Sequence, residues 1–188
     1  MNLPEGKKII NTRWVFKLKK DSHNVPVKLV AKGYSQEKGI NYTETSAPVI
    51  KHQSLRLILA IVANENLIVH HIDISTAFLY GELDDEVYIA IPEGLENRFQ
   101  KGHVLKLNKA LYGLKQAPRL WNKTLVNFLN NLKFQQLITD TCIFVYKDLI
   151  IAIYVDDIVI IGRKNHIIVD FKRKLIIALK QKTCGEIN

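Results

Sequence analysis

Cysteine is almost absent from this chain of 188 residues, which contains only Cys142 and Cys184. Two thiols in a chain of this length imply no disulfide framework, and their spacing suits no zinc site. The first residues, Met1–Lys8, lack the apolar core of a signal peptide. We therefore expect a soluble, intracellular protein that resides in the cytoplasm or the nucleus.

Long hydrophobic runs are also missing. The apolar run Leu149–Ile161 is interrupted by two acids and is shorter than the roughly 20 residues that a membrane-spanning helix needs. We therefore expect no membrane association. Hydrophobic residues make up 47% and charged residues 24% of the chain. These proportions are ordinary for a globular domain with a core of its own.

Acidic residues are the minority: 18 Asp and Glu stand against 27 Lys and Arg, which gives a formal net charge of +9. The excess lies at the two ends. Residues 1–40 hold nine basic and three acidic side chains, residues 162–188 hold seven and two, and the stretch between them is slightly acidic. This distribution suits a polyanion gripped at its edges with a cation held in between. Lysines on solvated faces would give the same pattern.

Two adjacent acids, Asp156 and Asp157, interrupt the run Leu149–Ile161. The run predicts two buried strands, Leu149–Val155 and Ile158–Ile161, joined by a tight turn made of the two acids. An unpaired polar group beside a core costs about 2–7 kcal/mol and a charge costs more, and adjacent carboxylates also repel each other. A divalent metal would neutralise both, and a metal held by carboxylates at a hairpin tip indicates phosphoryl chemistry.

A two-metal site needs a third acid, because carboxylates converge there from different strands on ions about 3.5–4 Å apart. Asp73 is the best candidate. It ends a short predicted strand, Leu67–Asp73, and has no Lys or Arg beside it in the sequence. The competing interpretation is that Asp73 caps the N-terminus of a following helix.

The spacing of apolar residues predicts one α+β unit, an antiparallel sheet with helices packed on one face. The predicted strands are Thr12–Lys19 and Val25–Tyr34, which form a basic hairpin, then Leu67–Asp73, Val87–Ile91, Val104–Leu107 and Cys142–Tyr146, followed by the central hairpin. Helices are predicted over Gln53–Asn64, from Pro118 through Leu132, and around Ile167, Phe171, Leu175 and Leu179.

An ordered set of short motifs runs through most of the chain: LPEGKK at 3–8, WVFK at 14–17, LVAKG at 29–33, SAPV at 46–49, DISTAFLYG at 73–81, EVY at 86–88, PEG at 92–94, LYGLKQAPR at 111–119 and YVDD at 154–157. The set resembles the reverse transcriptase domain of copia-type retrotransposon polyproteins. The resemblance implies a right-hand polymerase in a single domain over residues 1–188, with fingers at about 1–63 and 81–116 and a palm at about 64–80 and 117–188. It also implies two Mg²⁺ ions as cofactors, for which Mn²⁺ is a possible substitute.

The resemblance further implies roles for single residues near the acids. Asp73, Asp156 and Asp157 correspond to the catalytic, metal-binding aspartates of the family, and the backbone carbonyl of Ile74 would complete one metal's coordination. Phe78 corresponds to the aromatic residue beneath the sugar, where its ring would collide with a ribose 2′-hydroxyl. Simple core packing is the alternative for Phe78.

A second group of residues would contact substrates. The resemblance assigns the nucleotide to Lys19, Lys20, Lys28, Phe78, Gly113 and Gln116, and the template and primer to Tyr154, Lys115 and Arg119. Gly113 would let the backbone approach the nucleotide, and Gln116 would hydrogen-bond base or sugar unless it is an exposed loop residue. The implied partners are an RNA or DNA template with its primer, dNTPs, and the integrase and ribonuclease H of a complete Pol polyprotein.

The chain departs from the family pattern in its second finger strand. Pro26 and Lys28 stand where the family has Lys and Arg, which removes a charge, a backbone donor and a bidentate phosphate contact. The family's late Asp-Leu-Gly-Glu motif reads TCGE at 183–186. We expect the thumb, connection and ribonuclease H regions to be absent.

Two functions are consistent with these motifs. The first is an RNA-directed DNA polymerase that transfers dNTPs onto a primer 3′-hydroxyl by two-metal chemistry. The alternative is a truncated, inactive remnant that folds and binds nucleic acid only. A metal-dependent nuclease is the weakest reading, because it leaves Phe78 and the basic hairpin without a role.

Overall fold

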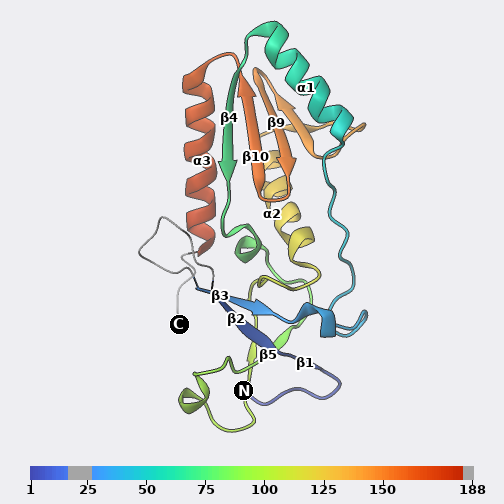
Figure 1. The fold of residues 1–188 in the computed structure, drawn as a ribbon, viewed down its shortest axis with the longest axis vertical. Coiled ribbons are helices and arrows are strands. Elements are labelled where there is room, and N and C mark those ends of the chain that lie inside the picture. The colour runs from blue at the N-terminus through green and yellow to red at the C-terminus, as the bar shows by residue number, and fades with distance from the viewer. Residues whose placement is uncertain (17–26, 184–188) are drawn as a thin grey trace.

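The computed structural model describes residues 1–16 and 27–183, without the side chains of residues 181–183, and arranges them as strands and helices in a two-part molecule (Figure 1). The larger part is built on a five-stranded, wholly antiparallel sheet, here called the main sheet. Its strands, in spatial order, are β4 (Ile68–Asp73), β10 (Asp157–Gly162), β9 (Leu149–Tyr154), β8 (Ile143–Tyr146) and β7 (Gln135–Gln136).

The smaller part contains two short sheets. One pairs β2 (Thr12–Phe16) with β3 (Val27–Ala31), so the predicted basic hairpin is confirmed in its described strands. The other pairs β5 (Tyr88–Ala90) with β6 (Val104–Lys106), two strands that the sequence predicts, and adds β1 (Ile9–Ile10) parallel to β5. Three single 3₁₀ turns are η1 (Gly33–Ser35), η2 (Ala77–Tyr80) and η3 (Glu96–Arg98).

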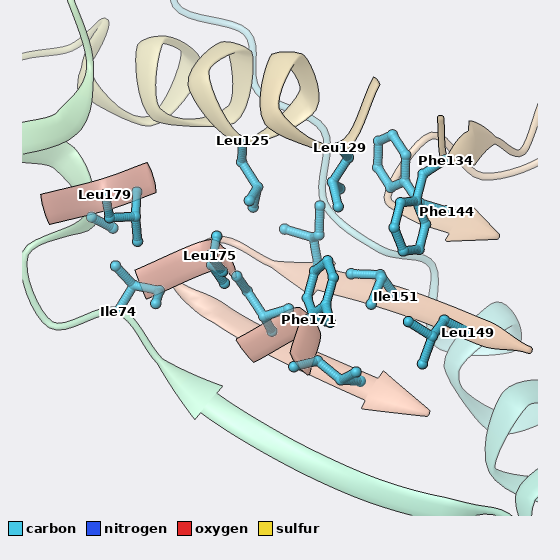
Figure 2. Packing of buried hydrophobic residues seen from close by; sticks show 14 of the residues in the cluster. Ile74, Leu125, Leu129, Phe134, Phe144, Leu149, Ile151, Phe171, Leu175 and Leu179 are labelled. Carbon is cyan, nitrogen blue, oxygen red and sulfur yellow. The ribbon is translucent and has the colours of Figure 1, made fainter. Parts of the chain in front are cut away.

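Two helices cover one face of the main sheet. They are α2 (Ala117–Asn131) and α3 (Asn165–Thr183), and α2 begins with Pro118 in its first turn, where a missing N–H costs nothing. One buried cluster lies between these helices and the sheet (Figure 2). It contains Leu125 and Leu129 of α2, Phe171 of α3 and Ile151 of β9. Strands buried on both faces carry nearly continuous Ile and Val, which is why β9 and β10 were recognisable as strands.

The remaining helix, α1 (His52–Glu65), lies on the opposite face. Its Ile58 packs with Ala152 of β9 and Ile161 of β10. The residues next to these along each strand, Ile151 and Ile160, belong to the cluster under α2 and α3, so α1 covers the other face. The prediction that helices pack on one face is therefore wrong for α1. Single-sequence periodicity shows that a helix has an apolar side but not which face of a sheet that side will cover.

The central hairpin differs from the prediction by one residue. Its two-residue turn consists of Val155 and Asp156, and Asp157 is the first residue of β10, paired with Tyr154. The prediction assigned the turn to both acids because acids favour turns. The register instead makes Val155 a turn residue with a φ of +56°.

A second buried cluster joins the two parts of the molecule. It contains Ala31 of β3, Ile89 of β5 and Leu120 of α2. Phe78 of η2 packs against both this cluster and the one under the main sheet. Among the described residues, no helix combines the length and the apolar character that crossing a bilayer requires.

Candidate active site

The three predicted acids come from two segments that the main sheet joins. Asp157 lies directly opposite Asp73, as a pair of residues on the antiparallel strands β10 and β4. The backbone N–H of Ile74 donates a hydrogen bond to the carbonyl oxygen of Asp156 at 3.0 Å. Because paired residues of antiparallel strands point to the same face, Asp73 and Asp157 share one face of the main sheet. The end of β4 lies beside the tip of the β9–β10 hairpin (Figure 1).

These acids are open to solvent. Asp73 is exposed, and Asp156 and Asp157 are half-buried. One carboxylate oxygen of Asp157 lies 2.7 Å from Nε2 of His71. His71 was not among the predicted site residues, although its position two residues before Asp73 puts it on the same face of β4. An alternation count along the predicted strand could have found it.

The donor chemistry of this edge fits a divalent cation, because carboxylate and carbonyl oxygens are the ligands that Mg²⁺ and Mn²⁺ take. The strand register places Asp73 opposite Asp157, as a cation site would require, but the side chains themselves do not converge on one point. In the part of the chain that the structure describes, no three His, Cys, Asp or Glu side chains are grouped closely enough to hold a metal ion. Asp157 is instead hydrogen-bonded to His71. The Ile74 carbonyl accepts a hydrogen bond from Ala77 N at 2.9 Å, which leaves it one lone pair.

The backbone is strained at Val155, the residue just before Asp156 in the turn of the β9–β10 hairpin. Val155 has a φ of +56°, a left-handed conformation that β-branched residues rarely adopt. Such a conformation costs about 1–3 kcal/mol and persists only where the surroundings enforce it. Strain of this kind is concentrated at functional sites, which supports a functional role for this turn.

An aromatic pair lies between the acids and the smaller part of the molecule. The ring of Phe78 is 5.0 Å from the ring of Tyr112, centroid to centroid, and Nζ of Lys28 lies 4.5 Å from the centre of the Tyr112 ring. The Tyr112 hydroxyl donates to the carbonyl oxygen of Ser75 at 2.6 Å. Phe78 is half-buried, so core packing and a site role are both compatible with its position.

Tyr112 is a site residue that the sequence did not reveal. Burial raises its pKa above the ordinary value, and the negative charges of Asp156 and Asp73 raise it further. The hydroxyl is held beside the segment that follows Asp73 by its bond to the Ser75 carbonyl. No local pattern points to this contact, because it depends on the packing of η2 against the LYGLKQAPR segment.

Gly113 is required by the packing of the protein itself. Its φ is +89°, and a Cβ atom there would lie 2.1 Å from the carbonyl oxygen of Ala31. The backbone of β3 approaches closely at this point, since Ala31 N donates to the Tyr112 carbonyl at 2.7 Å. This contact explains the glycine without a nucleotide.

Gln116 is 2% exposed and satisfied by protein partners. Its Oε1 accepts from Gln36 Nε2 at 2.9 Å, and its Nε2 donates to the Asn41 carbonyl at 3.0 Å. The structure thus gives Gln116 a buried structural role, in contrast to the expected contact with base or sugar. Lys115 is tied to the same network, because its Nζ donates to the Gln36 carbonyl at 3.1 Å.

The remaining predicted residues are distributed around the site. Tyr154 is 51% exposed and pairs with Asp157 across the hairpin. Arg119 forms ion pairs with Asp84 at 3.2 Å and Glu44 at 3.4 Å. The pKa of Asp84 is lowered first by a hydrogen bond from Lys123 and also by Arg119. Lys19 and Lys20 lie outside the described residues.

Comparison with known proteins agrees with the motifs. A family model described as "Reverse transcriptase (RNA-dependent DNA polymerase)" matches residues 1–188. The retrovirus-related Pol polyprotein from transposon TNT 1-94 of Nicotiana tabacum is 43% identical over 148 residues, which cover 77% of this chain and 11% of the polyprotein. The corresponding polyprotein from transposon RE1 of Arabidopsis thaliana is 40% identical over 146 residues, 76% of this chain and 10% of the polyprotein.

This chain therefore corresponds to about a tenth of the length of these relatives. The family match covers every motif of the sequence, including the segments that carry Asp73 and the Asp156–Asp157 pair. The chain belongs to the reverse transcriptase (RNA-dependent DNA polymerase) family, as a copia-type domain.

Proposed function

We propose that this chain carries the nucleotidyl-transfer centre of an RNA-directed DNA polymerase. In the reaction, a primer 3′-hydroxyl attacks the α-phosphorus of a dNTP, a P–O bond forms, and pyrophosphate leaves. The observation that carries the proposal is the pairing of Asp73 with Asp157, together with the hydrogen bond from Ile74 N to the Asp156 carbonyl. These contacts join acids that are far apart in the sequence.

The carboxylates of Asp73, Asp156 and Asp157 and the Ile74 carbonyl would hold the divalent cations that reverse transcriptases generally use. Two Mg²⁺ or Mn²⁺ ions bound there would make the primer hydroxyl more acidic and stabilise the departing pyrophosphate. The chain itself contributes the backbone frame: the β4–β10 register puts Asp73 opposite Asp157, and the hydrogen bond from Ile74 N to the Asp156 carbonyl ties the hairpin tip to the segment after Asp73. The carboxylates would turn toward the cations on this frame, and Asp157 would exchange His71 for a cation.

The nucleotide would lie against the Phe78–Tyr112 pair. The Phe78 ring is fixed by its neighbour and by two buried clusters, so it would exclude a ribose 2′-hydroxyl sterically. Lys28 lies over the other ring and would bring positive charge toward the phosphates. Lys19 and Lys20 are proposed to hold the triphosphate. Gln116 is not part of this proposed nucleotide contact, because its amide is buried and bonded to Gln36 and to the Asn41 carbonyl.

The template and primer would cross the open face beside the acids. Tyr154 is exposed there, and we propose that Lys115 and Arg119, the latter in the first turn of α2, follow the nucleic acid. In this proposal residues of about 1–63 and 81–116 are the fingers, and those of about 64–80 and 117–188 are the palm. Other Pol domains, including integrase and ribonuclease H, are proposed partners from the Pol polyprotein relatives.

Primer extension on poly(rA)·oligo(dT) by the 188-residue chain tests the proposal. Asp156→Asn should abolish magnesium-dependent incorporation, because it removes a ligand charge. The matched control is Asp148→Asn, since Asp148 is the second residue of the two-residue turn between β8 and β9, as Asp156 is between β9 and β10. The control should extend primers like the unmodified chain, and equal activity in all three proteins would refute the assignment.

The alternative, a remnant that binds nucleic acid without chemistry, makes a different prediction. It is favoured by one observation: in the described part of the chain the three acids are not grouped as a metal site, and Asp157 is held by His71. Salt-dependent binding to a primer–template, with no extension in either Mg²⁺ or Mn²⁺, would select this alternative.

A further inference from the structure

The turn between β9 and β10 is held from outside the hairpin at both of its peptide carbonyls. The Asp156 carbonyl accepts from Ile74 N at 3.0 Å, and the Val155 carbonyl accepts from the indole Nε1 of Trp121 at 2.7 Å. The first bond connects the tip to the segment after Asp73. The second connects it to α2, an element that contributes none of the three acids.

Trp121 is well suited to act as a fixed donor. It is 1% exposed, belongs to the cluster beneath the main sheet, and its ring centroid lies 6.0 Å from that of Tyr80. A buried indole ring cannot swing toward water to satisfy its N–H elsewhere. The hydrogen bond to Val155 is therefore imposed by the packing of α2.

The approach of α2 depends on a glycine. A Cβ atom at Gly81 would lie 2.8 Å from the Cβ of Leu120 and 3.2 Å from Trp121 N. Any other residue at position 81 would push the first turn of α2 away from η2. The glycine that ends the DISTAFLYG motif thus permits the contact that brings Trp121 within reach of the hairpin.

The turn needs such a restraint because its sequence does not favour its conformation. A two-residue hairpin turn with a positive φ at its first position normally carries Gly or Asn there. This turn has Val155 at a φ of +56°. The two-residue hairpin imposes this φ, since Lys147 takes a φ of +50° at the same place in the turn between β8 and β9. The bond from Trp121 holds the carbonyl of a β-branched residue for which the conformation is costly, next to Asp156.

We infer that Trp121 is a positioning residue: its indole N–H holds the Val155 carbonyl and so fixes the strained turn with Asp156 aimed at the cation site. This role rests on the proposed function, since the cations concerned are those of the nucleotidyl-transfer centre. Trp121 touches no reacting atom in this arrangement. It acts only through the peptide that precedes Asp156.

Trp121→Phe tests this role because it keeps an aromatic ring and deletes the donor. We expect the Mg²⁺ concentration for half-maximal primer extension to rise by about three- to tenfold, the factor that corresponds to one lost hydrogen bond. The rate at saturating Mg²⁺ should stay within about threefold of the unmodified chain. The matched control is Phe144→Leu, which loosens the same cluster from β8 at a fully buried site. An equal rise in this control, or no rise in Trp121→Phe, would overturn the inference.

A second measurement uses the unmodified chain and does not depend on polymerase activity. The chain has two tryptophans, and both indoles donate to backbone carbonyls: Trp121 to Val155 at 2.7 Å and Trp14 to Glu93 at 2.9 Å. In a ¹H–¹⁵N spectrum of the whole chain, titration with Mg²⁺ alone should shift the Trp121 indole signal and leave that of Trp14 in place. A stationary Trp121 signal would overturn the inference.

The strain at Val155 can be tested separately from the hydrogen bond. Asn adopts positive φ more readily than Val, so in a Val155→Asn background the Trp121→Phe change should raise the Mg²⁺ requirement less than it does with Val155 present. Equal rises in both backgrounds would show that Trp121 does not act through the strain. If the unmodified chain extends no primer, the proposed function fails, and the indole titration alone decides the inference.

Discussion

Asp73 and Asp157 face each other across neighbouring antiparallel strands, and this pairing places the two acids on one face of the main sheet. A shift of one residue in the β4–β10 register would turn one of them toward the buried face. The register is enforced by Ile72 and Ile158, which pair one step further along and pack on the side of α2 and α3. The hydrophobic pattern of the two strands therefore sets the position of the candidate site.

Phe78 offers a test of sugar selection. Phe78→Val should raise the use of rNTPs relative to dNTPs by about tenfold or more, because a smaller side chain no longer collides with the 2′-hydroxyl. Single-nucleotide incorporation with each substrate measures the ratio. Phe128→Val is the control, since Phe128 packs against the main cluster from α2. An unchanged ratio in Phe78→Val would leave Phe78 with a packing role only.

Gly113→Ala should destabilise the protein far more than Gly102→Ala. Both glycines have nearly the same φ, +89° and +88°, but a Cβ atom at Gly102 meets nothing within 4 Å, whereas at Gly113 it would overlap the Ala31 carbonyl. We expect a cost of about 1–2 kcal/mol at Gly102 from the left-handed conformation alone, and more than about 3 kcal/mol at Gly113 from the added overlap. Urea unfolding of both variants measures the difference. Equal costs would contradict the close approach of β3.

Gln116→Leu separates a structural role from a nucleotide contact. Removing the amide leaves Nε2 of Gln36 and the Asn41 carbonyl without their Gln116 partner, which should cost about 2–4 kcal/mol of unfolding free energy. Gln135→Leu, at an exposed position of β7, should change stability by less than about 0.5 kcal/mol. If Gln116→Leu instead keeps its stability and raises the KM for dNTPs, the residue contacts the nucleotide.

Asp140 gives the protein a pH dependence that can be measured. Burial raises the pKa of this carboxyl group, but hydrogen bonds from the Ser54 side chain and from Lys51 N and Cys142 N outweigh burial and lower it. A lowered folded-state pKa stabilises the protein above the ordinary value of about 3.9, and this stabilisation is lost as the pH falls through the lowered value.

The corresponding experiment compares Asp140→Asn with the unmodified chain by urea unfolding at several pH values. At pH 7 the variant should be less stable by about 1–3 kcal/mol, because a buried acceptor of two backbone N–H groups is weakened. The difference should shrink steadily below about pH 4. If the difference in unfolding free energy between the two proteins stays constant from pH 7 to below about pH 4, the ionisation of Asp140 is not its source. Asp148→Asn, in an exposed turn, is the control.

Several elements could be predicted because their signals are local. The α2 helix begins with Pro118 in its first turn and follows a regular apolar spacing, and β9 and β10 are nearly continuous runs of Ile and Val. The position of the central turn was missed by one residue. The reason is that local preference puts acids in turns, whereas pairing with β4 and β9 draws Asp157 into the strand.

Ordered motifs and apolar periodicity are properties of neighbouring residues, so the family and most of the helices and strands could be predicted from them, and the three acids could be proposed as candidates. Tertiary packing was needed to show that α1 covers the opposite face of the main sheet, that Gln116 is buried, and that Tyr112 and Trp121 donate to the backbone beside Asp73 and Asp156. These relationships join positions tens of residues apart or depend on which face of a strand packs against which helix. No local pattern encodes them, since the free energy of such contacts is realised only when the separate elements pack together.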